Sequence, residues 1–414
     1  MRNGLVAGFD HVTTPSDTAQ TDPAAAPRWT NLTLFLSGLV LLGVAGSLLD
    51  VTFNNYLNDV HHLDADSRGI LEFPRELPGF LTVFLIAGLA FLAETRIAAL
   101  AGAALGLGLL GLAWCGSTWG YMMAGLLLLS TGQHLMLPVQ SSIAMDLATG
   151  AATRGQRLGQ VNSYTAAARV VGYGLVWGLL AWVGARYSLV FAVAGLLALA
   201  GAAVLFGMRM PNAHLTRPRL VWNWRYRLYY LLAFFFGARK QIFLTFGPWV
   251  LIKIFHQPAM FFAQLMIVSA LLAILFQPAL GRAIDCLGER CVLMTDAAVT
   301  LLVCLGYASA HRLGSHGAAL GLLCICFVLD QLFMGTGMAR DIYLSKIAAR
   351  REDIAPTLSM GVTINHAVSM SIPALGGLVW MRYGHDKVFF AAAGLALVML
   401  FFTSRIRVPG KPGQ

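Results

Sequence analysis

Two adjacent cations, Arg239 and Lys240, stand in the middle of the otherwise apolar stretch LLAFFFGARKQIFLTFGPWVL, residues 231–251. If this stretch belongs to a membrane-spanning helix that starts at 227, they lie about 18–20 Å along its axis, near the bilayer midplane. A charged side chain at that depth costs roughly 2.5–3.5 kcal/mol on insertion scales, so it requires a partner or water. Adjacent helical residues diverge by about 100°. We therefore expect one cation to face a central cavity, where it can bind an anionic group, and the other to pair with an acid such as Asp330.

Three other apolar stretches carry polar residues at comparable depth. Asp50 and Asn54 are four residues apart, which places both on one helix face. Two further stretches each carry an adjacent polar pair, and membrane helices direct such side chains toward the bundle interior or a water-filled cavity. The candidate solute site therefore comprises Arg239, Lys240, Asp330, Gln331, Gln133, His134, Asp50 and Asn54.

The segment ILEFPRELPGF holds a separate charged cluster. Glu72 and Glu76 are four residues apart on one helix face, and Arg75 can reach both, while Pro74 and Pro78 weaken the backbone hydrogen bonding. One interpretation is a salt-bridged kink that forms part of an outer gate. The other makes Glu72 or Glu76 a proton carrier, because two acids that share one base and little water can have a raised pKa. The gate is our preferred interpretation.

All of these charges could instead have a purely structural role, in which they neutralise one another and bind no ligand. Four embedded acids balance four embedded bases, namely Asp50, Glu72, Glu76 and Asp330 against Arg75, Arg169, Arg239 and Lys240. A single member of the set can equally well serve structure or function, but intramembrane charges as a group mark pathways or proton relays. With the 72–76 cluster set aside, three bases face two acids, and this excess favours an anionic solute.

Composition identifies the elements that must hold these residues. The chain has 414 residues, of which 57% are hydrophobic and 12% charged, against roughly 45–50% and 25% in soluble domains. Apolar runs of about 20 residues recur, each long enough to cross a bilayer. We therefore predict an all-α polytopic membrane protein with twelve helices, near 32–58, 69–93, 97–114, 120–145, 159–184, 187–207, 227–254, 260–281, 291–311, 317–343, 357–381 and 387–404.

The distribution of basic residues predicts the topology. The tails and the loops on the side of the N-terminus hold 19 Lys and Arg, and the opposite loops hold 6, as the positive-inside rule requires of cytoplasmic termini. The net charge of +10 follows this asymmetry, so no nucleic-acid partner is expected. The predicted parts are a disordered cytoplasmic tail 1–30, a six-helix bundle 31–208, a basic cytoplasmic linker 209–226, a second six-helix bundle 227–405 and a cytoplasmic tail 406–414.

An internal repeat supports the division into two bundles. A shift of 203 residues aligns Gly132 with Gly335, Ser142 with Ser345, Asn162 with Asn365, Gly174 with Gly377 and Trp177 with Trp380. Asn162, Arg169, Asn365 and His366 are then expected along the seam between the bundles, the asparagines as interhelical hydrogen-bonding residues. For His366 we expect hydrogen-bonded packing, although its pKa also permits a proton switch.

Several classes of site have no sequence signal. The six cysteines form no CxxC pair, so neither a zinc site nor a disulfide framework is indicated. No phosphate-binding loop, HExxH motif or convincing pair of nucleophile and base occurs. We expect no cofactor, no metal, no enzymatic activity and no direct use of ATP.

The stretch GRAIDCLGERC, between the eighth and ninth predicted helices, resembles the Gly-x-x-x-Asp-(Arg)-x-Gly-x-Arg signature of the major facilitator superfamily. The matching residues are Gly281, Asp285, Gly288 and Arg290, with Cys286 where an arginine is common. In such a loop, glycines allow a tight reversal and close helix approach, and Asp and Arg form a charge relay that can lock one arrangement of the halves. The resemblance covers residues 30–405 and implies two pseudo-symmetric bundles that rock around a midplane site lined by helices one, four, seven and ten.

Other parts of the superfamily pattern are absent. Leu92 stands where the loop between helices two and three would carry the acid, and helix four lacks the arginine of the drug and proton antiporters. Our leading hypothesis is secondary transport of a small, anion-bearing organic solute, coupled to protons, by a monomer in the plasma (bacterial inner) membrane. The alternative within transport is proton-coupled efflux of multiple drugs or amphipathic compounds, with Asp50 or Asp330 attracting those that are cationic. A non-transporting sensor or intramembrane enzyme is the alternative outside transport.

Overall fold

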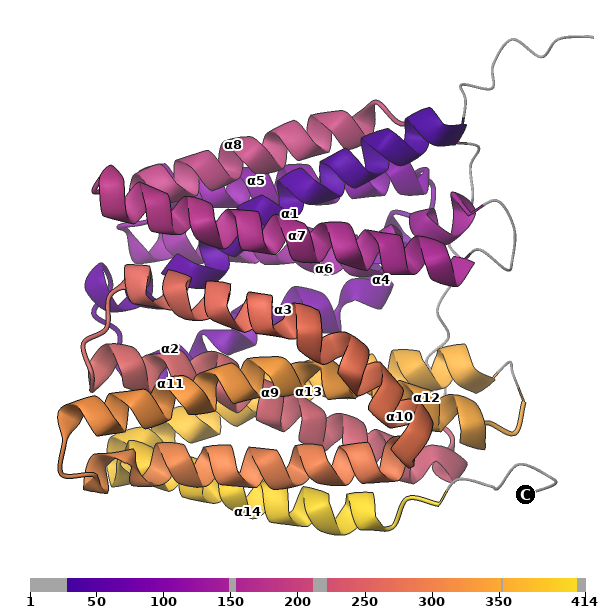
Figure 1. Ribbon diagram of the computed structural model, residues 1–414. Coiled ribbons are helices and arrows are strands. Elements are labelled where there is room, and N and C mark those ends of the chain that lie inside the picture. The colour runs from indigo at the N-terminus through magenta and orange to yellow at the C-terminus, as the bar shows by residue number, and fades with distance from the viewer. Residues whose placement is uncertain (1–27, 149–153, 211–221, 351–352, 408–414) are drawn as a thin grey trace, which may run out of the picture.

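The computed structural model describes residues 28–148, 154–210, 222–350 and 353–407, and it is helical with no strand in these ranges (Figure 1). The predicted tails and the centre of the predicted linker, at 1–27, 211–221 and 408–414, lie outside them. The first half of the chain forms α1 (Arg28–Asp59), α2 (Ala65–Ile70), α3 (Glu72–Phe80), α4 (Thr82–Gly88), α5 (Glu94–Cys115), α6 (Trp119–Asp146), α7 (Arg154–Trp182) and α8 (Tyr187–Phe206). The second forms η2 (Trp224–Tyr226), α9 (Arg227–Lys253), α10 (Ala259–Ser309), η3 (Ala310–Arg312), α11 (His316–Phe333), η4 (Met334–Thr336), α12 (Gly337–Ile347), α13 (Ile354–Tyr383) and α14 (His385–Ser404).

These elements make the twelve predicted membrane crossings. In the described part of the chain, nine helices are long and apolar enough to span a membrane, and the longest of them, 259–312, folds back on itself and so crosses twice. The other two crossings are α9, whose apolar run is interrupted by Arg239 and Lys240, and the segment formed by α2, α3 and α4. The protein is thus an all-α, multi-pass integral membrane protein.

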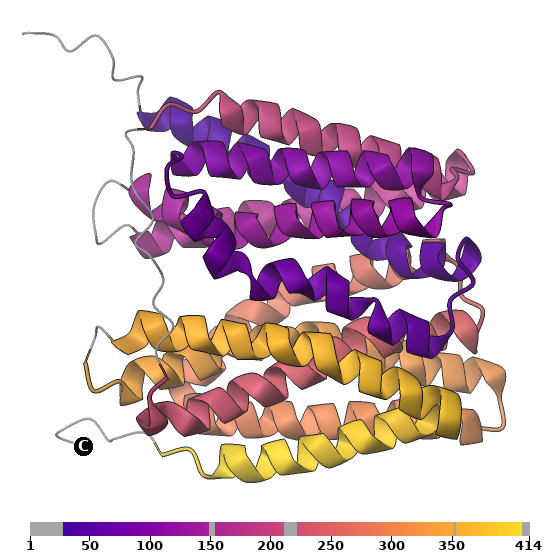
Figure 2. The same ribbon diagram turned by 180° about the vertical axis from the view of Figure 1, so that it is seen from behind.

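The helices form two groups that correspond to the two halves of the sequence. Figures 1 and 2 show most of the indigo-to-pink helices α1 to α8 on one side of the molecule and most of the salmon-to-yellow helices α9 to α14 on the other, with α2, α3 and the first part of α10 at the boundary. The groups meet where α2 and α3 pack on α13 and where α7 packs on α10. The start of α1 and the end of α14 lie at the same end of the bundle.

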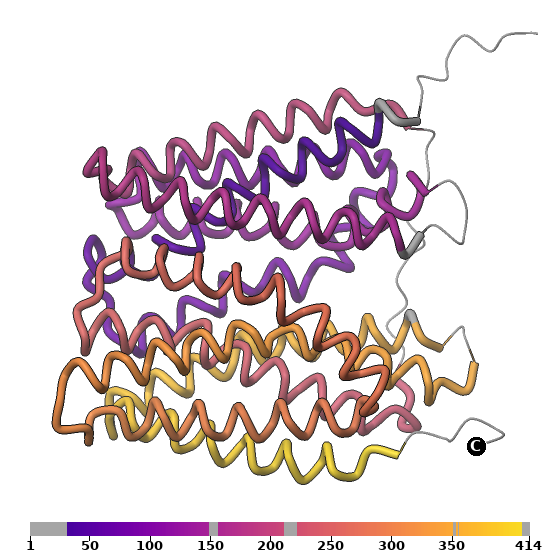
Figure 3. Tube along the Cα trace, viewed as in Figure 1, coloured from indigo at the N-terminus to yellow at the C-terminus, as the bar shows by residue number. Residues whose placement is uncertain are grey.

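The motif GRAIDCLGERC forms the reversal within α10, which is visible in the trace in Figure 3. Gly288 has φ 81° and ψ 161°, in a region that only glycine adopts without strain, and this residue ends one crossing and starts the next. The tight reversal predicted for this motif is therefore present. The close helix approach is not, because a Cβ at Gly281 or Gly288 would meet no atom within 4 Å.

The charge relay expected in this motif also differs from the prediction. Asp285 and Arg290 are both exposed and form no ion pair with any described residue. The loop is held instead by Glu289, which follows the turn at Gly288 directly and is buried. Its carboxylate pairs with Lys346 at the end of α12. The ion pair at this loop is therefore not the predicted one between Asp285 and Arg290, and both of its members belong to the second half of the protein.

The second crossing is broken into three short helices, where a single helix over 69–93 was predicted. Pro78 lies inside α3 and cannot donate a backbone hydrogen bond, and breaks occur at Leu71 and Leu81. The hydroxyl of Thr82 donates to the carbonyl oxygen of Pro78 over 2.9 Å, which satisfies one acceptor at the second break. This irregular path brings α2 and α3 against the second half of the protein.

The end of the molecule away from the termini is closed by close contacts between the halves. At Gly69 of α2, a Cβ would overlap the carbonyl oxygen of Pro373 in α13, and at Gly377 a Cβ would lie 2.5 Å from the carbonyl oxygen of Ala65. The amide of Asn55, near the end of α1, donates to the carbonyl oxygen of Gln257 over 2.9 Å. We call this end, defined by these three contacts, the sealed end.

Replacing Gly69 by Ala should open the sealed end. The added methyl group cannot fit against Pro373, and overpacking of this kind typically costs about 1–3 kcal/mol, which shifts the arrangement away from the sealed one. In a background without native cysteines, a cysteine at position 331 should react faster with an impermeant maleimide applied to the sealed side. Gly88→Ala is the matched control, because nothing lies within 4 Å of a Cβ there. Equal labelling rates in both variants would contradict the packing argument.

Candidate functional site

A cavity of about 270 Å³ lies between the two halves at the level of the embedded charges. It receives side chains from α1, α2, α3, α6, α7, α9, α10 and α11, so neither half forms it alone. Its walls combine aromatic and aliphatic residues with a group of polar ones. These are Asp50, Asn54, Arg68, Arg75, Arg169, Tyr173, Lys240, Asp330 and Gln331.

Arg239 is buried behind this cavity. Its Nη1 atom pairs with the carboxylate of Asp296 on α10, and its Nη2 atom donates to Oδ1 of Asp330 on α11 over 3.2 Å. Arg239 is 5% exposed, Asp296 0% and Asp330 4%, so all three charges depend on one another. The ion pair predicted between one of the two cations and Asp330 is present, and Arg239 makes it.

Lys240 points the other way, as the 100° divergence requires, and lines the cavity. Its Nζ atom donates to Oδ1 of Asn365 on α13 over 3.2 Å. Among the described residues, no carboxylate lies within ion-pair distance of this ammonium. Lys240 is therefore a charge at the cavity wall whose known partner is neutral.

Asp50 and Arg169 face the cavity from the first half of the protein. Both side chains are solvent-accessible, and neither forms a hydrogen bond or ion pair with another described residue. Asn54, one turn beyond Asp50 on α1, also lines the cavity, and its Oδ1 accepts a hydrogen bond from Nε of Arg68 over 2.9 Å. The face of α1 that carries Asp50 and Asn54 is thus directed at the cavity.

The charged cluster of α3 is shared between two arginines. Glu72, fully buried, accepts from Nη1 of Arg68 over 2.5 Å and from Nη1 of Arg75 over 2.9 Å. The predicted contact of Arg75 with Glu76 is not made, because Arg75 turns toward Glu72. Glu76 accepts instead from Nδ1 of His366 over 2.9 Å, across the boundary between the halves.

The structure brings together most of the predicted solute-site residues and separates three of them. Asp50, Asn54, Lys240, Asp330 and Gln331 line the central cavity. The remaining three lie elsewhere: Arg239 is behind the wall, Gln133 lines a lateral pocket between α1, α5, α6 and α7, and His134 faces Glu76. The motif residues Gly281, Asp285, Gly288 and Arg290 lie at the reversal of α10, away from this cavity.

Two charged residues of the site were missed from the sequence. Asp296 is only the sixth residue of the predicted ninth helix, so it was counted with the charges at helix ends and not with the embedded ones. Arg68 directly precedes the predicted second helix and was counted with the charges of an external loop. With both included, the embedded acids are Asp50, Glu72, Glu76, Asp296 and Asp330, and the bases are Arg68, Arg75, Arg169, Arg239 and Lys240. The predicted excess of one base outside the α3 cluster is therefore wrong, because Asp296 cancels it.

The cavity wall is nevertheless cationic. Four bases and two acids line it, but Arg68 and Arg75 are paired with Glu72, and Asp330 is paired with Arg239. The lining charges that form no ion pair with a described residue are Arg169 and Lys240 against Asp50. Glu72, which offsets Arg68 and Arg75, is buried behind them. The overall charge balance is thus zero while the surface offered to a bound molecule is positive.

No protein-family model matches the chain, and no curated protein matches its sequence. Solved structures share its fold over nearly its whole length. The inward-open xylose transporter XylE from E. coli has a TM-score of 0.72 at 14% identity over 94% of this chain and 98% of that one. The nucleoside transporter NupG gives 0.70 at 15% identity over 91% and 98%.

A third structure, a bacterial homologue of the human lysosomal transporter Spinster in an inward-facing, occupied conformation, gives a TM-score of 0.70 at 13% identity over 92% of this chain and 98% of that one. All three are transporters of the major facilitator type. The chain therefore has the fold of major facilitator transporters, with twelve crossings in two halves.

Proposed function

We propose that this protein is a secondary active transporter that moves a small, anion-bearing organic solute by alternating access, coupled to protons. The fold supports transport, because transporters for unlike solutes share it. The halves meet across a central cavity and are closed at one end, which is the geometry that rocking of two bundles requires.

The main support for an anionic solute is the difference between the two adjacent cations, Arg239 and Lys240. Arg239 is held by two buried carboxylates, whereas Lys240 lines the cavity with an amide oxygen as its partner. Arg169 lies on the opposite wall and forms no hydrogen bond or ion pair with a described residue, and its nearby opposite charge is that of Asp50. Two cations on opposite walls can bind a carboxylate or phosphate group between them, and a charge-assisted hydrogen bond is about twice as strong as a neutral one.

The size of the cavity favours a small solute. Ligand pockets commonly measure about 300–1,000 Å³, and this one is near the lower limit at about 270 Å³. Phe243, Phe262, Phe327 and Met266 form apolar parts of its wall. We infer a solute with one acidic group and a short apolar or neutral body.

A binding screen tests this proposal. Purified protein is mixed with matched pairs of small organic acids and their amides, and the melting temperature is recorded, because binding to the folded state stabilises it by RT ln(1 + [L]/Kd). We expect an acid to stabilise the protein and its amide not to. Lys240→Gln should abolish the stabilisation, while Lys387→Gln, at an exposed position on α14, should preserve it. Stabilisation by the amide alone would overturn the anionic preference.

Asp50 supports a second candidate, the efflux of cationic amphipathic compounds. Its carboxylate is accessible in the cavity and has no ion-pair partner among the described residues. A cation could therefore approach it beside the aromatic wall. Stabilisation by lipophilic cations that is lost in Asp50→Asn and kept in Lys240→Gln would favour this candidate.

The orientation and assembly are also part of the proposal. The excess of Lys and Arg in the loops near the termini, 19 against 6, supports cytoplasmic termini in a bacterial inner membrane. The sealed end then faces outward. Each chain contains a complete cavity, which supports a functional monomer.

A further inference from the structure

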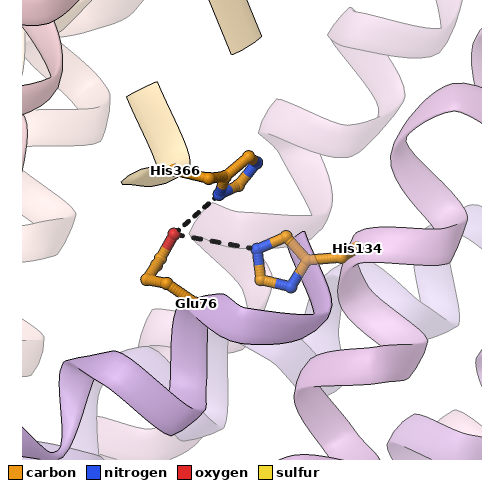
Figure 4. Close-up of side chains that lie close together, drawn as sticks. All are labelled: Glu76, His134 and His366. Atoms are coloured by element: carbon orange, nitrogen blue, oxygen red, sulfur yellow. Dashed lines mark hydrogen bonds and ion pairs between the residues drawn. The ribbon is translucent and has the colours of Figure 1, made fainter. Parts of the chain in front are cut away.

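Three potential metal ligands from three helices converge at the boundary between the halves, apart from the wall of the central cavity. Figure 4 shows the carboxylate of Glu76 on α3 directed at the imidazoles of His134 on α6 and His366 on α13. Oε2 of Glu76 lies 2.9 Å from Nδ1 of His366 and 3.9 Å from Nε2 of His134. Two of these residues belong to the first half of the protein and one to the second.

The spacing of these atoms is that of a metal site. Zinc bonds of about 2.0–2.2 Å at a tetrahedral angle place two ligand atoms about 3.3–3.6 Å apart. The two separations from Glu76 lie on either side of this value, and one donor atom from each residue falls within 4.8 Å of the others. Small movements of the two imidazoles therefore complete the geometry.

The surroundings orient the histidine donors. Nδ1 of His134 lies 2.9 Å from the carbonyl oxygen of Ser130, so its proton is held there and Nε2 is left with its lone pair toward Glu76. In metal-binding histidines, the N–H group of the other ring nitrogen characteristically donates a hydrogen bond to a carbonyl oxygen or a carboxylate in this way. Gly79 leaves room for both rings, because a Cβ there would lie 2.5 Å from Cδ2 of His134 and 2.5 Å from Cε1 of His366.

We propose that Glu76, His134 and His366 bind a divalent transition metal, best matched by Zn²⁺, through Oε2, Nε2 and Nδ1, with water as the fourth ligand. The metal then replaces the proton that Nδ1 of His366 shares with Glu76, and the neutral imidazole carries its proton on Nε2. Two histidines and one glutamate form a ligand set that zinc uses in proteins when one position stays open. No metal signal was visible in the sequence, because Glu76 and His366 are 290 residues apart and no cysteine takes part. A bound ion would tie α3 and α6 to α13 and so hold the halves in the sealed arrangement.

Nearby charges limit the affinity without preventing binding. Arg75, on the same helix as Glu76, is directed to Glu72, and Lys240 on α9 is held by Asn365. Both cations repel a metal ion at short range. We therefore expect weaker binding than in closed structural zinc sites and easy removal by chelators.

Zinc titration of the purified, chelator-treated protein tests this site without any assumption about transport. We expect ZnCl₂ to raise the melting temperature and MgCl₂ not to, because Mg²⁺ prefers oxygen ligands. His366→Ala should weaken zinc binding, measured calorimetrically, by more than the roughly 10–100-fold that loss of an outer-shell partner costs. His316→Ala, an exposed histidine on α11, should leave the affinity unchanged.

Two further variants protect the test against a folding defect in His366→Ala. Glu76→Gln keeps the side-chain volume but removes the anionic ligand, and Gly79→Ala displaces both rings. Both should also weaken zinc binding. The inference is overturned if zinc neither stabilises nor binds the unmodified protein, or if it binds all four variants with equal affinity. Because the readout is binding, its failure would leave the proposed transport function intact.

Discussion

Arg239→Gln should lower the free energy of unfolding by about 3–5 kcal/mol, the range for removing one partner of a buried ion pair. Arg239 is the only described base in ion-pair contact with Asp296 and Asp330, and both carboxylates are almost fully buried. Without the guanidinium they must either stay charged without compensation or take up protons. Unfolding of the purified protein by denaturant in mixed micelles measures the loss.

Two comparisons separate this ion-pair effect from a general loss of packing. Combining Arg239→Met with Asp296→Asn and Asp330→Asn removes the whole set of charges and should recover much of the stability, because the loss comes from unpaired charge. Asp341→Asn, at an acid that is 47% exposed and pairs with Arg340, should cost less than about 1 kcal/mol. A triple variant less stable than Arg239→Gln would contradict this account.

Asp50→Asn should separate solute exchange from the proton gradient. Asp50 is the acid on the cavity wall that has no ion-pair partner among the described residues, so a proton can bind there without breaking a salt bridge. Coupling free energies between two binding sites are typically about 1–3 kcal/mol, so loss of the coupling between proton and solute should lower the gradient-driven accumulation of solute about 5–150-fold. Exchange between solute pools at equal pH should continue, because Lys240 and Arg169 remain. Uptake into proteoliposomes, with and without a pH gradient, measures both quantities.

Asp341→Asn, at an exposed acid outside the cavity, is the matched control and should keep gradient-driven uptake. If Asp50→Asn stops exchange as well, Asp50 contributes to solute binding. If it affects neither process, the proton is carried by another group, and the proposed coupling through Asp50 is lost.

Much of the fold could be predicted from the sequence because a bilayer imposes a length on every crossing. The predicted helix 120–145, for example, matches α6 at Trp119–Asp146. The largest exception was the second crossing, where Pro78 and two backbone breaks replace one helix by three. The predicted helix 317–343 is also interrupted, by η4 between α11 and α12. Proline permits such a break without specifying its position, because neighbouring helices decide how the freed backbone groups are satisfied.

The site was less predictable, since its geometry depends on helix rotation and on contacts between distant segments. Helical geometry predicts the angle of about 100° between Arg239 and Lys240. It does not predict which of the two faces the cavity, because the packing of α9 against α10 and α11 directs Arg239 toward Asp296 and Asp330. Helical geometry likewise requires the adjacent residues Gln133 and His134 to point in different directions, but only the packing of α6 determines what each of them contacts. The meeting of Glu76 with His366 depends on how the halves dock, which no local pattern of residues records.

The most direct test of the account is uptake of a small organic acid, selected by the thermal screen, into proteoliposomes that contain the purified protein. We expect saturable exchange by the unmodified protein and by Lys387→Gln, and loss of exchange in Lys240→Gln, which stays folded because Lys240 forms no buried ion pair with a described residue. Unchanged exchange in Lys240→Gln, or exchange of the matching amide at the same rate as the acid, would show that this cavity does not bind the anionic group of its solute.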